Sequence, residues 1–213
     1  MVRGGLVRAF WYTCCGGGPV RRARRLADLG RGIAHLRPRS NLFGAVFRVR
    51  SRLAFAIHQY FQSRSFHYVH TPIITTSDCE GAGEMFHVTT LDLNNVPRAE
   101  AHVDFAKDFF AAEASLTVSG QLEGEIFASA LKKIYTFGPT FRAENSNTPR
   151  HLAEFWMIEP EMAFADLAAD AALAEEFLRF LCRSVLEECP EEMAFFNTHL
   201  DTGLIDRVGR VAG

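Results

Sequence analysis

Two extended segments joined by a short polar loop limit what this chain can fold into more than any other feature of its sequence. The first segment covers 134–141, and Arg142 and Glu144 follow at its end. After the loop 145–150, a second segment covers 154–164. Neighbouring strands that are joined by a short loop pair in the antiparallel direction. The sequence therefore predicts an antiparallel strand pair within the fold.

The two-residue period of a strand places Arg142 and Glu144 on the same face of this pair. On spacing alone, an arginine and a glutamate in this relation are more often a solvated ion pair, which contributes little to stability. A function for the two side chains therefore rests on the motifs around them.

The other predicted elements follow in mixed order. A helix begins at Ser40 or Asn41, either of which can cap it, and its apolar side chains recur every three or four residues at Leu42, Val46, Val49, Leu53, Ile57 and Tyr60. Further patterns predict extended runs over 66–74 and 115–118, helices over 120–131 and 167–185, a loop over 77–84 and a surface insertion over 92–107. We therefore expect the α+β class, with an antiparallel sheet flanked by helices.

The composition is that of an ordinary globular protein. Of the 213 residues, 48% are hydrophobic and 23% are charged, which favours one compact domain. The formal net charge is -2, so any contact with a nucleic acid must be local. The five cysteines form no CxxC pair, which predicts a reduced intracellular protein, and no apolar run has the length of a membrane span.

Residues 1–35 differ from the rest of the chain. This leader is rich in arginine and glycine, and Asp28 is its one acidic residue. An organelle-targeting peptide has a similar charge bias but is usually rich in serine, which the leader lacks, and a basic arm that touches RNA phosphates is another interpretation. We expect a poorly ordered leader over 1–35 and a folded part over 36–213.

The motifs of the folded part resemble those of a known family. Residues 141–144, the loop and 150–155 together resemble motif 2 of the class II aminoacyl-tRNA synthetases, and 65–74 resembles motif 1. The segments 77–84 and 116–122 resemble the asparaginyl-tRNA synthetases of bacterial or organellar type. The resemblance implies that the chain is the N-terminal part of a class II catalytic domain.

This resemblance implies an ATP site along motif 2. Arg142 is the implied catalytic residue, because its planar guanidinium suits the α-phosphate, on which charge builds during activation of the amino acid. Glu144 would accept a hydrogen bond from the adenine amino group, His151 would contact the γ-phosphate, and the ring of Phe155 would stack on adenine. On the residues alone, His151 could instead bond to the loop backbone and Phe155 could belong to the core.

An amino-acid pocket is also implied, formed by Glu80, Ser119, Gln121, Glu125 and Glu159. An ammonium group needs carboxylates and amide oxygens around it, which Glu80, Gln121 and Glu159 would supply. Glu125 would accept a hydrogen bond from the NH₂ of an asparagine side chain, whereas the aspartyl enzymes carry a lysine at the position of Gly124. The alternatives are a solvated Glu80 and a Glu125 that only decorates its helix.

Two macromolecular partners follow from the resemblance. The acceptor end of tRNA(Asn) would contact the loop at Asn145, Ser146, Asn147, Thr148 and Arg150. A second copy of the chain would bind at motif 1, where Pro72 marks the implied homodimer interface. No membrane partner is expected.

The third motif of the family, a glycine-rich segment with a second ATP-binding arginine, has no counterpart after Glu161. The acidic residues that hold Mg²⁺ usually lie just before that motif, so no metal site is expected in this chain. We expect a fragment, an aberrant gene product or a partial gene model.

The implied function is that of an asparagine–tRNA ligase, which uses ATP to activate asparagine and transfers it to tRNA(Asn). The expected compartment is the cytoplasm, with the mitochondrion or plastid as alternatives, and this chain by itself is expected to be inactive. A noncatalytic dimerising or RNA-binding remnant and an ammonia-dependent asparagine synthetase are the alternative functions.

Overall fold

The computed structural model describes residues 34–79, 81, 84–145 and 152–213. They form two compact units: a helical unit, made of the described residues up to Phe66 together with Ala165–Gly213, and a sheet unit, His67–Phe164. The predicted leader lies outside the described residues except for positions 34 and 35. Within the described part of the chain, no helix is long and apolar enough to cross a membrane.

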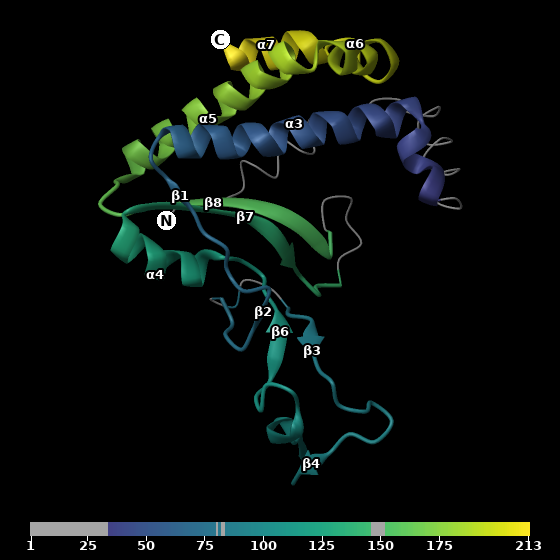
Figure 1. The fold of residues 1–213 in the computed structure, drawn as a ribbon, viewed down its shortest axis with the longest axis vertical. Coiled ribbons are helices and arrows are strands. Elements are labelled where there is room, and N and C mark those ends of the chain that lie inside the picture. Colours follow the sequence, from purple (N-terminus) through teal and green to yellow (C-terminus); the bar gives the residue numbers. More distant parts are fainter. Residues whose placement is uncertain (1–33, 80, 82–83, 146–151) are drawn as a thin grey trace. The chain divides into compact units, whose positions relative to one another are not determined.

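The helical unit begins with the 3-10 helix η1 (Ala34–Arg39) and the long helix α3 (Asn41–Ser63) (Figure 1). The predicted cap of α3 is confirmed, because the Ser40 hydroxyl oxygen accepts a hydrogen bond from the Phe43 amide at 3.2 Å. A side chain at this position satisfies one of the amides that the first turn leaves without a helical partner.

Three further helices complete this unit, α5 (Leu167–Glu188), α6 (Pro190–His199) and α7 (Leu204–Ala212). The predicted helix over 167–185 is α5, and the carboxylate of Asp166 caps it by accepting from the Ala169 amide at 2.8 Å. The core between α3 and α5 is aromatic, with the ring of Phe177 5.0 Å from Tyr60 and 4.9 Å from Phe61, centroid to centroid.

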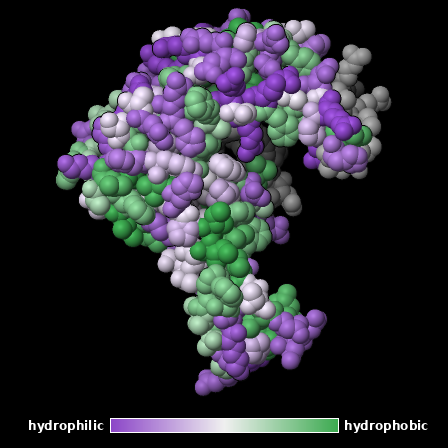
Figure 2. Space-filling model, viewed as in Figure 1, coloured by the Kyte–Doolittle hydropathy of each residue, from purple (hydrophilic) through white to green (hydrophobic). Residues whose placement is uncertain are grey.

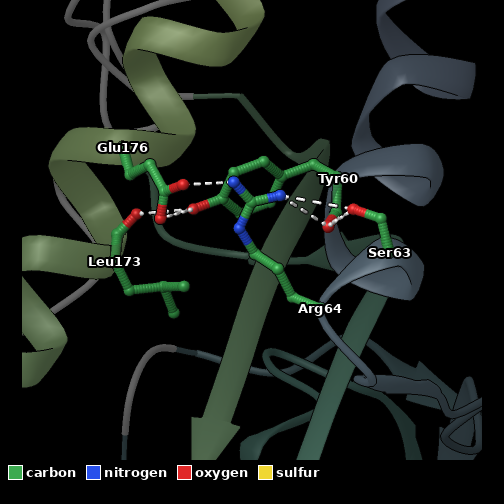
Figure 3. Close-up of polar contacts among 5 residues, drawn as sticks. All are labelled: Tyr60, Ser63, Arg64, Leu173 and Glu176. Carbon is green, nitrogen blue, oxygen red and sulfur yellow. Dashed lines mark hydrogen bonds and ion pairs between the residues drawn. The ribbon is translucent and has the colours of Figure 1, made fainter.

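A polar cluster borders this aromatic core at the end of α3 (Figure 3). Its members are Tyr60, Ser63 and Arg64, together with Leu173 and Glu176 of α5. The Tyr60 hydroxyl lies 3.3 Å from both the Leu173 carbonyl oxygen and the Glu176 carboxylate. The guanidinium of Arg64 pairs with Glu176 and stacks on the Tyr60 ring, 3.8 Å from its centroid. The cluster thus connects α3 to α5 through hydrogen bonds, an ion pair and a cation–π contact.

Burial raises the pKa of Tyr60 to about 12, against a partly compensating effect of the Arg64 charge. The hydrogen bond from Arg64 lowers the pKa of the Glu176 carboxyl. A carboxyl whose pKa is lower in the folded protein than in the unfolded chain stabilises the fold above its unfolded pKa, and this stabilisation disappears as the pH falls through the folded pKa.

We therefore expect Glu176→Gln to lower the thermal midpoint at pH 7 by about 2–4 °C, which corresponds to about 1 kcal/mol for a partly exposed ion pair. The difference between the two proteins should shrink at acid pH, once the pH has fallen below the lowered folded pKa of Glu176 and its carboxyl is neutral. Thermal unfolding followed by circular dichroism at both pH values measures this.

Glu175→Gln is the matched control, because Glu175 pairs with Arg179 on the exposed side of the same helix. It should change the midpoint less than Glu176→Gln at pH 7. Equal effects of the two substitutions would show that the cluster adds nothing to an ordinary surface pair.

The sheet unit is built on the long strands β7 (Lys133–Phe141) and β8 (Glu154–Met162). They pair antiparallel from Lys133 opposite Met162 to Phe141 opposite Glu154, which confirms the predicted strand pair. The short strand β1 (His67–Tyr68) adds to the other side of β7 and runs parallel to it. Helix α4 (Gln121–Leu131) lies beside β7 and β8, where a helix was predicted over 120–131 (Figure 1).

A second sheet of three short strands has the order β2 (Ile74–Thr75), β6 (Ala114–Leu116) and β3 (His87–Val88). The predicted extended run over 66–74 is thus split between β1 and β2, which belong to different sheets. Pro72 lies between the two strands, and a proline cannot donate the ladder hydrogen bond that a continuous strand would need.

The predicted insertion over 92–107 contains a small hairpin of β4 (Arg98–Ala99) and β5 (His102–Val103), followed by the 3-10 helix η2 (Phe105–Lys107). Asp108 holds the end of this segment, because its carboxylate accepts from the Thr90 amide and hydroxyl at 2.9 and 2.8 Å. The insertion is therefore structured as well as exposed.

Candidate functional site

One face of the β7–β8 pair carries Phe155 and Glu159 of the predicted site, and Arg142 follows directly after β7. Opposite residues of an antiparallel pair share a face. In this register Thr136 lies opposite Glu159, Gly138 opposite Met157, and Thr140 opposite Phe155. The Thr136 hydroxyl donates to the Glu159 carboxylate at 2.7 Å, which places this set of alternating residues on a common face.

Glu159 is the centre of the polar contacts on this face. Its carboxylate accepts hydrogen bonds from the Ser119 hydroxyl at 2.5 Å, the Gly120 amide at 3.1 Å and the Thr136 hydroxyl. All three donors are neutral, and no described lysine or arginine forms an ion pair with Glu159. The described residues therefore give this carboxylate hydrogen-bond donors but no cationic partner, which suits a site for a positively charged ligand group.

The same contacts position the start of α4. The Ser119 hydroxyl oxygen accepts from the Gln121 amide at 3.1 Å, so it links Glu159 to the first turn of the helix. One turn later, the Gln121 side-chain amide donates to the Glu125 carboxylate at 3.2 Å. Ser119 and Glu159 thus meet at the start of α4, and Gln121 and Glu125 follow on its first turns. Their role as an amino-acid pocket stays a prediction.

Two glycines let α4 approach the sheet. Gly124 is buried, and a Cβ atom there would lie 3.5 Å from Ile134 Cδ1 and 3.8 Å from Glu161 Cγ. A Cβ atom on Gly120 would lie only 2.7 Å from the Thr71 hydroxyl oxygen and 3.1 Å from the Glu159 carboxylate. Contacts that short exclude a side chain at Gly120 unless its neighbours move.

Arg142 and Phe155 lie together at the other end of the face. The guanidinium carbon of Arg142 is 5.4 Å from the centroid of the Phe155 ring. The Arg142 Nε atom is buried and has no hydrogen-bond partner among the described residues. A buried donor without a partner is unusual in proteins, and a bound anion would satisfy it.

The backbone around Arg142 is held on both sides. The Arg142 amide donates to the Ala153 carbonyl oxygen at 3.0 Å, which extends the β7–β8 pairing by one step. The Ala143 amide donates to the Glu84 carbonyl oxygen at 2.7 Å, so the end of the predicted 77–84 loop lies against the strand that precedes Glu144. These bonds orient the segment that carries the two predicted ATP contacts.

Part of the predicted site lies outside the described residues. This holds for Glu80 of the amino-acid pocket, for His151 of the ATP site, and for the tRNA contacts Ser146, Asn147, Thr148 and Arg150. Asn145 is described and exposed, and Glu144 is partly buried. The functional roles assigned to all of these residues stay predictions.

Sequence reasoning missed Thr136 and the backbone amide of Gly120 as partners of Glu159. Strand alternation alone could have placed Thr136 on one face with Gly138 and Thr140, but its pairing with Glu159 depends on the strand register. Among the described residues, no three histidine, cysteine, aspartate or glutamate side chains gather where they could hold a metal ion. The expectation that the Mg²⁺ ligands lie elsewhere stays a prediction.

Among the described residues, this face has a carboxylate without a cationic partner at one end and an arginine whose Nε atom lacks a hydrogen-bond partner at the other. This arrangement agrees with the family that the sequence suggested. Residues 31–208 match the family of class II tRNA synthetases (D, K and N), and the chain belongs to this family. The α+β class and the partial class II catalytic fold predicted from the motifs are thereby confirmed.

Two of the similar proteins are bacterial asparagine–tRNA ligases. The chain is 72% identical over 194 residues to the asparagine–tRNA ligase of Geobacter metallireducens, and the match covers 91% of this chain and 42% of that protein. The asparagine–tRNA ligase of Geobacter sulfurreducens is 70% identical over 195 residues, again with 42% of its length covered. The chain thus spans less than half the length of these relatives.

A solved structure supports the same grouping. The asparaginyl-tRNA synthetase of Pyrococcus horikoshii, complexed with asparaginyl-adenylate, superposes with a TM-score of 0.66 at 29% sequence identity. The match covers 82% of this chain and 35% of that one. The resemblance to asparaginyl-tRNA synthetases stated from the motifs is confirmed.

Gly120→Ala should destabilise the sheet unit, because the added methyl group would collide with Thr71 and Glu159 at once. We expect a loss of about 1–3 kcal/mol, as for other overpacked sites, and faster hydrogen exchange of the Gln121 amide. Thermal unfolding and amide exchange of the full chain measure the two effects.

Gly138→Ala is the matched control in the same unit, because a Cβ atom there meets no heavy atom of the described residues within 4 Å. It should leave the unfolding midpoint unchanged or raise it. A Gly120→Ala variant as stable as this control would contradict the close packing at the start of α4.

Proposed function

We propose that the chain forms the amino-acid- and ATP-binding part of an asparagine–tRNA ligase, which activates asparagine with ATP and transfers it to tRNA(Asn). The observation that carries this proposal is the arrangement of opposite charges along one sheet face, with Glu159 beside the start of α4 and Arg142 at the far end. An amino acid brings an ammonium group and ATP brings phosphates, and each would find its counter-charge at one end of this face.

In the proposed reaction, a carboxylate oxygen of asparagine attacks the α-phosphorus of ATP, the bond to the β-phosphate oxygen breaks, and pyrophosphate leaves. Negative charge builds on the α-phosphoryl oxygens, where the Arg142 guanidinium would stabilise it. Phe155 would stack on the adenine ring, and Glu144 would accept a hydrogen bond from the adenine amino group. Glu159 would hold the ammonium group, with Gln121 beside it.

We assign the selection of asparagine over aspartate to Glu125 and Gly124. Glu125 can accept a hydrogen bond from the NH₂ of the substrate side chain, and its present partner is the side-chain amide of Gln121. No lysine or arginine follows Gln121 before Lys132, so this helix offers a substrate carboxylate no cation. Aspartate would lose its hydration there without compensation.

The test uses the Geobacter metallireducens enzyme with its matching segment replaced by residues 34–208 of this chain. This hybrid should catalyse asparagine-dependent pyrophosphate exchange, whereas the 213-residue chain alone should not, because Arg142 by itself stabilises only part of the developing charge. Removal of one such group costs about a hundredfold or more in rate. An inactive hybrid would contradict the proposed function.

Within the hybrid, Glu125→Gln should lower the ratio of kcat/KM for asparagine over aspartate by at least tenfold, because the charged acceptor of the amide is lost. Gly124→Lys should lower the same ratio by supplying a cation for aspartate. If Glu125→Gln leaves the ratio unchanged, Glu125 only decorates its helix, and the assignment of substrate choice is wrong.

We also propose that two copies associate through the segment around Pro72. Ile73 and Ile74 beside it are nearly half exposed, and Phe86, which precedes β3, is exposed as well. Figure 2 shows hydrophobic surface over the part of the sheet unit that contains β2, β3 and β6. Apolar side chains gathered at a short-stranded sheet are typical of a covered interface.

Light scattering with size-exclusion chromatography should therefore give the mass of a dimer for the 213-residue chain. Ile73→Asp combined with Ile74→Asp should shift the chain to monomer, because each charge would have to be desolvated in the interface. The control Ile126→Asp changes an isoleucine of α4 that is 69% exposed. A stable monomer of the unsubstituted chain would contradict this assignment.

The tRNA contact and the cellular compartment belong to the same proposal. Binding of the tRNA acceptor end is proposed for the loop that begins at Asn145, with Arg150 as its source of positive charge. The cytoplasm is the proposed compartment, supported by the bacterial origin of the similar ligases.

A further inference from the structure

Gly138 lies in the interior of a nine-residue strand, where a glycine is unfavourable. It has no side chain to pack, and it loses more conformational entropy on folding than any other residue. In strands, a glycine commonly marks a bulge, a special backbone conformation, or a place where another backbone or a ligand approaches closely.

A bulge, a special backbone conformation and the approach of another backbone do not explain Gly138. The β7–β8 register continues through it without interruption, from Phe137 opposite Ile158 to Pro139 opposite Trp156, so there is no bulge. Among the described glycines, a positive φ is found at Gly81 and not at Gly138. A Cβ atom built on Gly138 would meet no heavy atom of the described residues within 4 Å, so no neighbouring backbone approaches it.

Gly138 differs in this respect from the other glycines of the site. At Gly120 a Cβ atom would collide with Thr71 and Glu159, and at Gly124 it would touch Ile134. Those two glycines are explained by the packing of α4 on the sheet. At Gly138 no heavy atom of the described residues lies within 4 Å of the Cβ position, which leaves the approach of a ligand as the explanation.

The position of Gly138 along the strand indicates which part of a ligand would approach it. The pair Thr136–Glu159 lies two residues along the strands in one direction, and the pair Thr140–Phe155 lies two residues along in the other. Two residues of a strand span about 7 Å. Gly138 therefore lies midway between the carboxylate that would hold the amino acid and the ring that would stack on adenine.

We propose that the asparagine carboxylate and the α-phosphate of ATP meet over Gly138, and that the size of the side chain at position 138 limits formation of the adenylate. This inference rests on the proposed function. A side chain that extends beyond a methyl group would occupy the space in which the oxygen and the phosphorus must approach each other, and a displacement of about 1 Å can cost a hundredfold in rate.

The test is a size series at position 138 in the hybrid enzyme described above: Gly138→Ala, Gly138→Val and Gly138→Leu. Gly138→Ala should keep pyrophosphate exchange within a few-fold, because the open space accepts one methyl group. Gly138→Val and Gly138→Leu should lower kcat at least a hundredfold. The dissociation constant of asparagine alone, measured by calorimetry, should change less than threefold, because Glu159 and its donors are untouched.

Folding is followed separately in the full 213-residue chain. Gly138→Val should not lower the thermal midpoint, since valine favours strands and meets open space here. Gly209→Ala, on the exposed side of α7, is the control for a glycine that has open space outside the site, and it should leave exchange by the hybrid unchanged.

Full exchange activity of Gly138→Leu would overturn the inference and leave the proposed function standing. A thermal midpoint that falls in step with activity would also overturn it, because the effect would then be structural. An unsubstituted hybrid without exchange activity would overturn the proposed function and the inference together.

Discussion

The hydrogen-bonded register of β7 and β8 is the constraint on which the site depends. Because Thr136 lies opposite Glu159, the carboxylate reaches the Ser119 hydroxyl and the Gly120 amide, and these contacts fix where α4 begins. A slip of one residue would move Glu159 to the opposite face. The position of the amino-acid pocket is therefore a property of the strand ladder as much as of the residues that line it.

Elements with strong periodicity could be predicted from the sequence, and contacts that depend on register could not. Helix α3 and its Ser40 cap, helix α4 and the two long strands appear within a few residues of their predicted bounds, because each carries apolar side chains at the spacing of its own element. The parallel pairing of β1 with β7 was not predicted, since two residues carry no pattern of their own. The division into two units was missed because both units have ordinary composition.

In the candidate site, too, motifs identified some residues, whereas other contacts became visible only in the structure. Motif resemblance selected Ser119, Gln121, Glu125 and Glu159, and the structure brings these four together. Resemblance gave no reason to consider Thr136, because its hydroxyl matters only through its distance to Glu159. The unpartnered Nε atom of Arg142 could likewise not be inferred, since burial of one atom depends on the whole surrounding structure.

The hairpin that forms the floor of the site also has a consequence for how the chain folds. Helix α4, β7 and β8 follow one another in the sequence, so their contacts close only short loops and cost little chain entropy. Strand β1 comes from the far end of the same unit and must close a much longer loop to reach β7. We expect α4, β7 and β8 to form early in folding and β1 to be added last. A nascent chain would then have the site residues of these three elements in place before its sheet is complete.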